Sequence, residues 1–255
     1  MSSMLAHNLS RFKLVTFDVT NTLLKFSKAP GVQYTETANS HGITSIEPKT
    51  VSIAFRKNFK ILAKEYPNFG YNSQINWHEW WRLLVIQTLN DASSSKLDQK
   101  TVNKVAYTLI EQYQTPLCWE KYHKADELLR KVKETGKCVG IISNFDSRLK
   151  TLLNNMKFNQ IDFILPSYEI GVMKPNTKIF EKALKESGIL ISPSEALHIG
   201  NEIELDCKGA LDAGWSGILI RNCERDSIKE NLVKCPMYDT LEILLNDLET
   251  KELNL

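Results

Sequence analysis

The sequence lacks several features that would assign it to a specialised class. It has no uninterrupted apolar run of the roughly 18 residues that a membrane-spanning helix needs, and no apolar stretch of a secretory signal near its N-terminus. Its 32 Lys and Arg and 30 Asp and Glu leave a net charge of only +2, without the basic excess typical of nucleic-acid binding. We therefore expect no membrane span and no nucleic-acid partner.

Paired cysteine motifs are also missing. The sequence contains five cysteines and no C-x-x-C spacing, which favours neither a disulfide framework nor a zinc site. The cysteines are Cys118, Cys138, Cys207, Cys223 and Cys235. We interpret them as small core residues in a reducing compartment, and we expect a cytoplasmic location, with the nucleus and the mitochondrion left open.

Four short apolar runs end at polar or glycine residues, and they are the strongest signal of fold class. They comprise residues 14–17, 138–142, 196–199 and 216–220. Continuous apolar runs of this length are typical of strands buried on both faces of a parallel sheet. Segments with helical spacing lie between them, for example Leu128, Leu129 and Val132 before Gly136. This alternation predicts an α/β domain with a Rossmann-like, doubly wound parallel sheet.

The region of residues 28–115 interrupts the alternation, because its apolar residues follow helical spacing throughout. Its edges carry residues that break helices, Ala29-Pro30-Gly31 at the entry and Thr115-Pro116 at the exit. The sequence therefore predicts an all-helical domain of residues 28–115, inserted into a core domain of residues 1–27 and 116–255.

Polar residues that follow the predicted strands are candidates for a site, because ligands of open parallel sheets bind beyond the carboxyl ends of the strands. The candidates are Asp18, Thr20 and Thr22 after the first run, Ser143 and Asn144 after the second, Asn201, Glu202 and Asp206 after the third, and Lys174 ahead of Pro175. Carboxylates, hydroxyls and one ammonium together suit a phosphate and a hard metal ion.

These segments resemble the motifs of the haloacid dehalogenase superfamily of hydrolases. DVTNTLL at residues 18–24, Ser143-Asn144, Lys174-Pro175 and the loop of residues 200–206 occur in the order and rough spacing of that superfamily. Within it, FDVTNTLL, ISNFD and KP are most similar to the haloacid dehalogenase-like hydrolase domain-containing protein 3 group. The resemblance implies that the helical insertion is a cap of the first type.

The resemblance also implies roles for single residues. Asp18 would attack a phosphoryl group as a nucleophile, Thr22 and Ser143 would bind its oxygens, and Lys174 would balance the negative charge. Thr20 and Asn144 are the expected substrate-binding residues. Magnesium would bind among Asp18, Thr20, Asn201, Glu202 and Asp206. The implied activity is that of a hydrolase, a phosphatase acting on a small phosphorylated metabolite.

Two positions depart from the family pattern. Thr20 stands where phosphatases of the family carry a second Asp as acid and base, and a hydroxyl cannot titrate near neutral pH. Asn201 stands where a carboxylate is usual, so we expect magnesium to be held weakly or not at all. Three hypotheses follow: a slow phosphatase, an inactive relative that binds a ligand or a partner, and, ranked last, a metal-free dehalogenase.

Overall fold

The computed structural model describes residues 4–222 and 235–251, which form two compact units. Unit 1 comprises Met1–Lys25, Lys121–Asn144 and Lys157–Leu255, and unit 2 comprises Phe26–Glu120 and Phe145–Met156. Compactness alone does not show which unit acts as a cap, so the predicted boundaries of core and cap stay predictions. In the described part of the chain, no helix is both long and apolar enough to cross a membrane.

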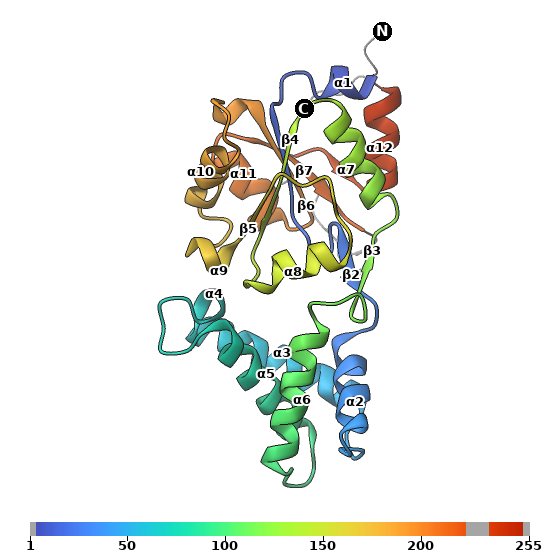
Figure 1. Ribbon diagram of the computed structural model, residues 1–255, viewed down its shortest axis with the longest axis vertical. Coiled ribbons are helices and arrows are strands. Elements are labelled where there is room, and N and C mark those ends of the chain that lie inside the picture. Colours follow the sequence, from blue (N-terminus) through green and yellow to red (C-terminus); the bar gives the residue numbers. More distant parts are fainter. Residues whose placement is uncertain (1–3, 223–234, 252–255) are drawn as a thin grey trace. The chain divides into compact units, whose positions relative to one another are not determined.

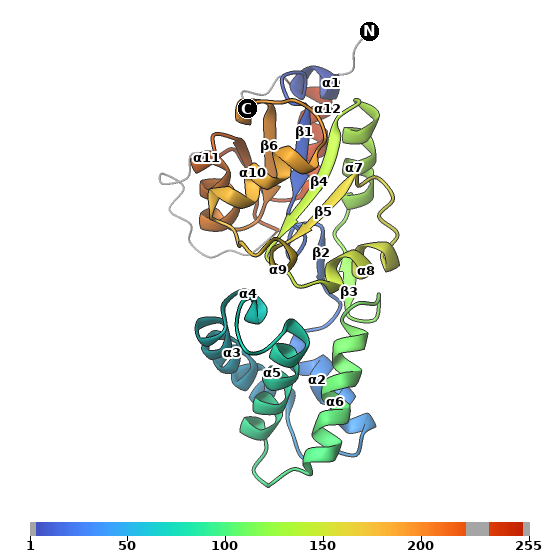
Figure 2. The ribbon, with the colours of Figure 1, turned by 60° about the vertical axis from the view of Figure 1, so that its left-hand side comes forward.

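Unit 1 is built on a parallel sheet of six strands in the order β5-β4-β1-β6-β7-β8 (Figures 1 and 2). The strands are β1 (Leu14–Phe17), β4 (Cys138–Ser143), β5 (Phe163–Pro166), β6 (Ala196–Gly200), β7 (Ser216–Ile220) and β8 (Met237–Tyr238). This order confirms the predicted doubly wound α/β fold, since β1 lies in the centre and the chain extends the sheet on both sides of it. The short strands β5 and β8 were not predicted.

Helices cover both faces of this sheet (Figure 1). They are α1 (Met4–Asn8), α7 (Ala125–Glu134), α9 (Ser167–Ile170), α10 (Thr177–Glu186), α11 (Gly209–Asp212) and α12 (Leu241–Thr250), with the short helical turns η1 (Pro193–Glu195) and η2 (Ile203–Lys208). In Figure 1, α10 and α11 lie on one side of the strands and α7 and α12 on the other. Buried apolar residues from the sheet and from α10, such as Leu14, Ile142 and Phe180, form one core cluster.

Unit 2 is helical and has its own core. It contains α2 (Pro30–Ser40), α3 (Pro48–Glu65), α4 (Pro67–Gly70), α5 (Trp77–Ala92), α6 (Gln99–Gln112) and α8 (Arg148–Asn155). Asn76 and Asp98 cap the N-termini of α5 and α6 with their side chains, which satisfies backbone N–H groups that a helix start leaves open. Val51, Val102 and Leu109 belong to its larger apolar cluster. The strands β2 (Leu24–Phe26) and β3 (Trp119–Lys121) form a separate two-stranded sheet. They contain the residues at which the chain leaves and re-enters unit 1.

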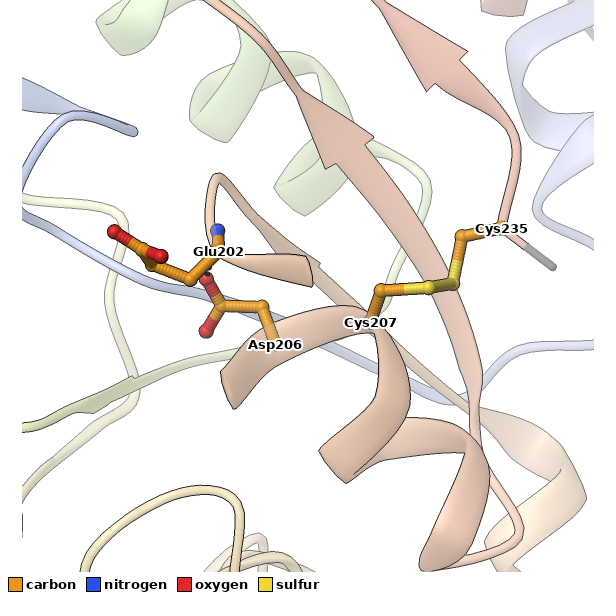
Figure 3. Close-up of a disulfide and its surroundings, with 4 residues drawn as sticks. All are labelled: Glu202, Asp206, Cys207 and Cys235. Atoms are coloured by element: carbon orange, nitrogen blue, oxygen red, sulfur yellow. Dashed lines mark hydrogen bonds between the residues drawn. A yellow bond between two sulfur atoms is a disulfide. The ribbon is translucent and has the colours of Figure 1, made fainter. Parts of the chain in front are cut away.

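One expectation about the cysteines is wrong, because Cys207 and Cys235 form a disulfide (Figure 3). The two residues are 28 positions apart, a spacing that carries no recognisable signal. The fold brings them together over Gly217 of β7, where a Cβ atom would lie 2.7 Å from the Sγ of Cys235. The absence of a side chain at Gly217 thus makes room for the bridge. Cys118 and Cys138 are free thiols, and Cys223 lies outside the described residues.

Candidate active site

Asp18 follows β1 and carries the carboxylate around which the site is built. Its backbone N–H donates to the carbonyl oxygen of Ile199 at 2.9 Å, which continues the pairing of β1 with β6 by one residue. The residue is 7% exposed. The hydroxyl of Ser143 donates to Oδ1 of Asp18 at 3.0 Å, and Nζ of Lys174 donates to the same oxygen at 2.7 Å. Three of the predicted catalytic residues therefore meet at one carboxylate oxygen.

Lys174 is 3% exposed, and three oxygens surround its ammonium. Besides Asp18, Nζ donates to the carbonyl oxygen of Ile142 at 2.9 Å and to Oδ1 of Asp206 at 2.6 Å. An ammonium has three hydrogens, so these contacts use all of them. The side chain of Asn144 holds the backbone of Lys174 from both sides, since Oδ1 accepts from its N–H at 2.8 Å and Nδ2 donates to its carbonyl at 3.0 Å. These are contacts that position Lys174; a substrate-binding role for Asn144 stays a prediction.

Asp206 lies in η2, close to the carboxyl end of β6. Its carboxylate accepts from Lys174, from Nε2 of His198 at 3.1 Å and from the backbone N–H of Glu202 at 2.9 Å. Gly200 permits this position, because a Cβ there would lie 2.2 Å from Cγ of Asp206. Figure 3 shows that Asp206 points toward the backbone of Glu202 while the next residue, Cys207, points toward Cys235. The loop after β6 thus joins the site on one side and the disulfide on the other.

Thr22 and Asn201 form a second, separate contact. The Thr22 side chain is buried, and its hydroxyl donates to Oδ1 of Asn201 at 3.2 Å. Within residues 4–222 and 235–251, no hydrogen bond joins either side chain to Asp18. Thr20 is half-buried, and Glu202 is exposed. Of the predicted residues, the structure thus gathers Asp18, Ser143, Lys174 and Asp206 around one cluster and keeps Thr22 with Asn201 beside it.

His198 was missed by the sequence reasoning. It lies in the middle of β6 and is 1% exposed, with Nδ1 at 2.8 Å from Oγ1 of Thr16 and Nε2 facing Asp206. The sequence does contain one signal, a lone titratable residue inside an otherwise apolar strand. A buried imidazole needs hydrogen-bond partners, but the sequence does not show which residues these are.

The charges in the cluster depend on one another. Burial raises the pKa of Asp18 above its ordinary value, with Lys174 opposing the shift and Asp206 adding to it. Burial alone would also raise the pKa of Asp206, but Lys174 and His198 hold it below its ordinary value. Burial would lower the pKa of Lys174, yet the two carboxylates together raise it. Asp206 and Lys174 are therefore charged at neutral pH, and Asp18 is the carboxylate that binds a proton more readily.

Magnesium would have few charged ligands here. Among the described residues, no group of three or more His, Cys, Asp or Glu side chains is arranged to hold a metal ion. The donors that the family resemblance assigns here would all be oxygens, namely the second carboxylate oxygen of Asp18, the carbonyl of Thr20 and the amide oxygen of Asn201. Oxygen ligands suit the chemistry of magnesium, although only Asp18 among them brings charge.

The site thus has an Asp after the first strand, a Ser at the end of the neighbouring strand and a buried Lys that contacts the Asp. A family profile described as haloacid dehalogenase-like hydrolase matches residues 12–214. The chain belongs to this family, as the sequence motifs indicated.

Similar proteins identify a smaller group within this family. The chain is 41% identical over 221 residues to the rhythmically expressed gene 2 protein of Drosophila melanogaster, with 84% of each chain covered. It is 30% identical over 251 residues to the haloacid dehalogenase-like hydrolase domain-containing protein 3 of Homo sapiens, with 93% of this chain and 98% of the relative covered. The resemblance to this group is thereby confirmed.

Solved structures share the fold at lower identity. A 2-haloacid dehalogenase from Pseudomonas syringae pv. Tomato has a TM-score of 0.63 and 21% identity, with 93% of this chain and 98% of the other covered. A phosphatase of the family from Thermococcus onnurineus has a TM-score of 0.65 and 18% identity, with 95% and 100% covered. At these identities the likeness establishes the fold alone, and it does not distinguish the two chemistries.

Proposed function

We propose that the protein is a slow, magnesium-dependent phosphatase that acts on a small phosphorylated metabolite through an aspartyl-phosphate at Asp18. The observation that carries the proposal is the contact of Ser143 and Lys174 with one oxygen of Asp18, at 3.0 and 2.7 Å. This arrangement orients the carboxylate and leaves its other oxygen, Oδ2, without a hydrogen bond from the part of the chain that the structure describes.

In the first step, Oδ2 of Asp18 attacks phosphorus, and the bond between phosphorus and the leaving oxygen breaks. The leaving alkoxide takes a proton from water, because the hydroxyl of Thr20 does not titrate near neutral pH. Lys174 would offset the negative charge of the phosphoryl group while its three hydrogens stay with Asp18, Asp206 and Ile142. Ser143 would exchange its hydrogen bond to Asp18 for one to a phosphoryl oxygen.

In the second step, water attacks the phosphorus atom of the aspartyl-phosphate, releases inorganic phosphate and restores Asp18. A general base normally assists this attack by about 10²–10⁴-fold, and Thr20 cannot supply that help. We therefore expect the second step to be slow and the phosphorylated protein to accumulate.

The donors described above make Asp18, the carbonyl of Thr20 and Asn201 the residues that would hold magnesium, with Glu202 next in the sequence. When bound, the ion would offset the repulsion between the carboxylate and the anionic substrate. Asp206 is less suited to direct ligation, because Lys174, His198 and the Glu202 backbone already donate to its two oxygens.

A specific observation also favours a second candidate, an inactive relative that binds a ligand or a partner. Asn201 and Thr20 remove two carboxylates from the family pattern, and no ready-made cluster of metal-binding side chains occurs among the described residues. A dehalogenase ranks third, because the dehalogenases of this superfamily carry D-x-Y-x-T and this chain has Thr20 at the position of the Tyr.

The test is incubation with magnesium and an aryl or acyl phosphate, followed by intact mass spectrometry and assay of released phosphate. We expect wild-type protein to gain one phosphoryl group and to release phosphate slowly. Asp18→Asn should do neither, since an amide is a poor nucleophile. Asp126→Asn, at an exposed carboxylate of α7, is the matched control and should behave as wild type.

Three outcomes separate the candidates. Phosphate release that Asp18→Asn abolishes supports the phosphatase. Failure of the wild type to gain a phosphoryl group or to release phosphate favours the inactive relative. Halide release from a 2-haloacid without magnesium would instead favour the dehalogenase.

A further inference from the structure

His198 is a buried imidazole that the proposed mechanism does not use. It pairs in register with Thr16 of β1 and with Gly217 of β7, so it lies in the interior of the sheet. A polar ring in such surroundings costs free energy unless its nitrogens are hydrogen-bonded. Both are: Nδ1 contacts Thr16 and Nε2 contacts Asp206.

The two contacts define the tautomer of the ring. An ionised carboxylate only accepts hydrogen bonds, so the hydrogen between His198 and Asp206 belongs to Nε2. Nδ1 then accepts from the hydroxyl of Thr16 at 2.8 Å. The other acceptor near this hydroxyl, the carbonyl oxygen of Leu197, is more distant at 3.4 Å. The Thr16 hydroxyl therefore selects the form of His198 that can donate to Asp206.

His198 acts on the same oxygen of Asp206 that contacts Lys174. Oδ1 of Asp206 accepts from Nε2 of His198 at 3.1 Å and from Nζ of Lys174 at 2.6 Å. His198 and Gly200 are two residues apart on one strand and face the same side of the sheet. The Asp206 carboxylate thus lies over Gly200, and His198 donates a hydrogen bond to it from the sheet.

We infer that His198 is a positioning residue, which holds Asp206 so that Asp206 keeps the Lys174 ammonium beside Asp18. Thr16 supports this role by selecting the tautomer. The inference rests on the proposed function only in its consequence for turnover, because the hydrogen-bonded chain itself is a property of the folded protein.

Three substitutions separate hydrogen bonding from packing. Gln places an amide N–H close to the position of Nε2, Asn places one close to Nδ1 and out of reach of Asp206, and Leu fills the space without a donor. We expect His198→Asn and His198→Leu to lower kcat by about 10- to 100-fold, the usual effect of losing a partner that orients a functional group, with a smaller change in KM. His198→Gln should recover most of the activity.

Two measurements do not depend on turnover. Nitrogen NMR of labelled wild-type protein should show hydrogen on Nε2 and none on Nδ1 of His198. Calorimetry with inorganic phosphate should show weaker binding to the Asn and Leu variants than to wild type and His198→Gln. The NMR experiment uses wild type alone, so it still tests the inference where a variant does not fold or where wild type releases no phosphate.

Hydrogen on Nδ1 in wild type would overturn the inference. The same follows if His198→Leu matches wild type in turnover and phosphate affinity, because packing would then explain the residue. If wild type shows the expected tautomer and binds phosphate but has no turnover, the proposed function fails while the positioning role survives.

Discussion

Lys174 is the single residue with most influence on the charge of the candidate site. Its ammonium is shared by Asp18 and Asp206, so the buried cluster has one cation and two carboxylates. Removing such charges from water is costly, and the mutual attraction compensates only when the groups are well hydrogen-bonded. An incoming phosphate would add further negative charge to this cluster. We therefore expect an anionic substrate to bind together with a cation.

The pH dependence of activity should report the charge of Asp18. Burial raises the pKa of this carboxyl, and only the ionised form can attack. We expect kcat/KM for an aryl phosphate to rise with pH through a value above the ordinary Asp pKa of 3.8. The measurement is a pH profile of kcat/KM, with circular dichroism at each pH to verify folding. A profile without an acidic limb above that value would contradict the assignment of Asp18.

Restoring the missing acid and base at residue 20 should accelerate the enzyme. Thr20→Asp supplies a carboxyl group where the family usually has one, and we expect turnover to rise by up to about 10²–10⁴-fold. Thr20→Asn is the matched control, since it has the same shape as Asp and no titratable proton. Phosphate release under saturating substrate measures the effect. An equal gain in the Asn variant would show that shape, and not proton transfer, limits turnover.

At the scale of elements, the sequence could predict the parts that depend on local pattern. β1, β4, β6 and β7 are continuous apolar runs, and α7 buries Leu128, Leu129 and Val132 on one face, so each is visible in the sequence. β8 is only two residues long, so it resembles a loop, and β5 ends in Pro166, a residue type that argues against a strand.

Features that depend on pairing between distant elements were not predictable. His198 faces Asp206 and Thr16 because of the register between β1 and β6, and that register is absent from any local pattern. The disulfide likewise needs Cys207 of η2 and Cys235, two residues before β8, to meet over Gly217. By contrast, polar residues at the ends of neighbouring parallel strands, such as Asp18 and Ser143, are brought together by topology alone.

The Cys207–Cys235 disulfide should stabilise the loop that carries Asp206. Closing a loop between residues 28 positions apart restricts the conformations of the unfolded chain, so reduction should lower the free energy of unfolding by about 3.6 kcal/mol. Urea unfolding with and without a dithiol reductant measures the difference. Cys207→Ser is the control: it should have the stability of the reduced protein and not respond to the reductant. Equal stability of wild type in both states would contradict the prediction.

At the scale of the whole molecule, the chain contains two units with separate apolar clusters. Unit 2 has a cluster around Val102 and Leu109, and unit 1 has one around Ile142 and Phe180. The five tryptophans are unevenly divided, because only Trp215 belongs to unit 1. Tryptophan fluorescence therefore reports mainly on unit 2, whereas phosphate should bind to residues of unit 1. The two units can be followed independently.

We expect the two units to unfold in separate steps, as chains with more than one core commonly do. Leu109→Ala, in α6 of unit 2, should lower the free energy of the step seen by fluorescence by about 2–5 kcal/mol. Leu128→Ala, in α7 of unit 1, is the matched control and should affect the other step, seen as the part of the far-UV circular dichroism change that tryptophan fluorescence does not accompany.

Inorganic phosphate should stabilise unit 1, whereas the two substitutions each destabilise a unit. At about 100 times its Kd, phosphate should stabilise the step of unit 1 by about 2.7 kcal/mol and leave the fluorescence step unchanged. Urea titrations that follow both signals distinguish the outcomes. If both signals have one midpoint in wild type, and both substitutions and phosphate move it equally, the units unfold as one, and the separate cores do not confer separate stability.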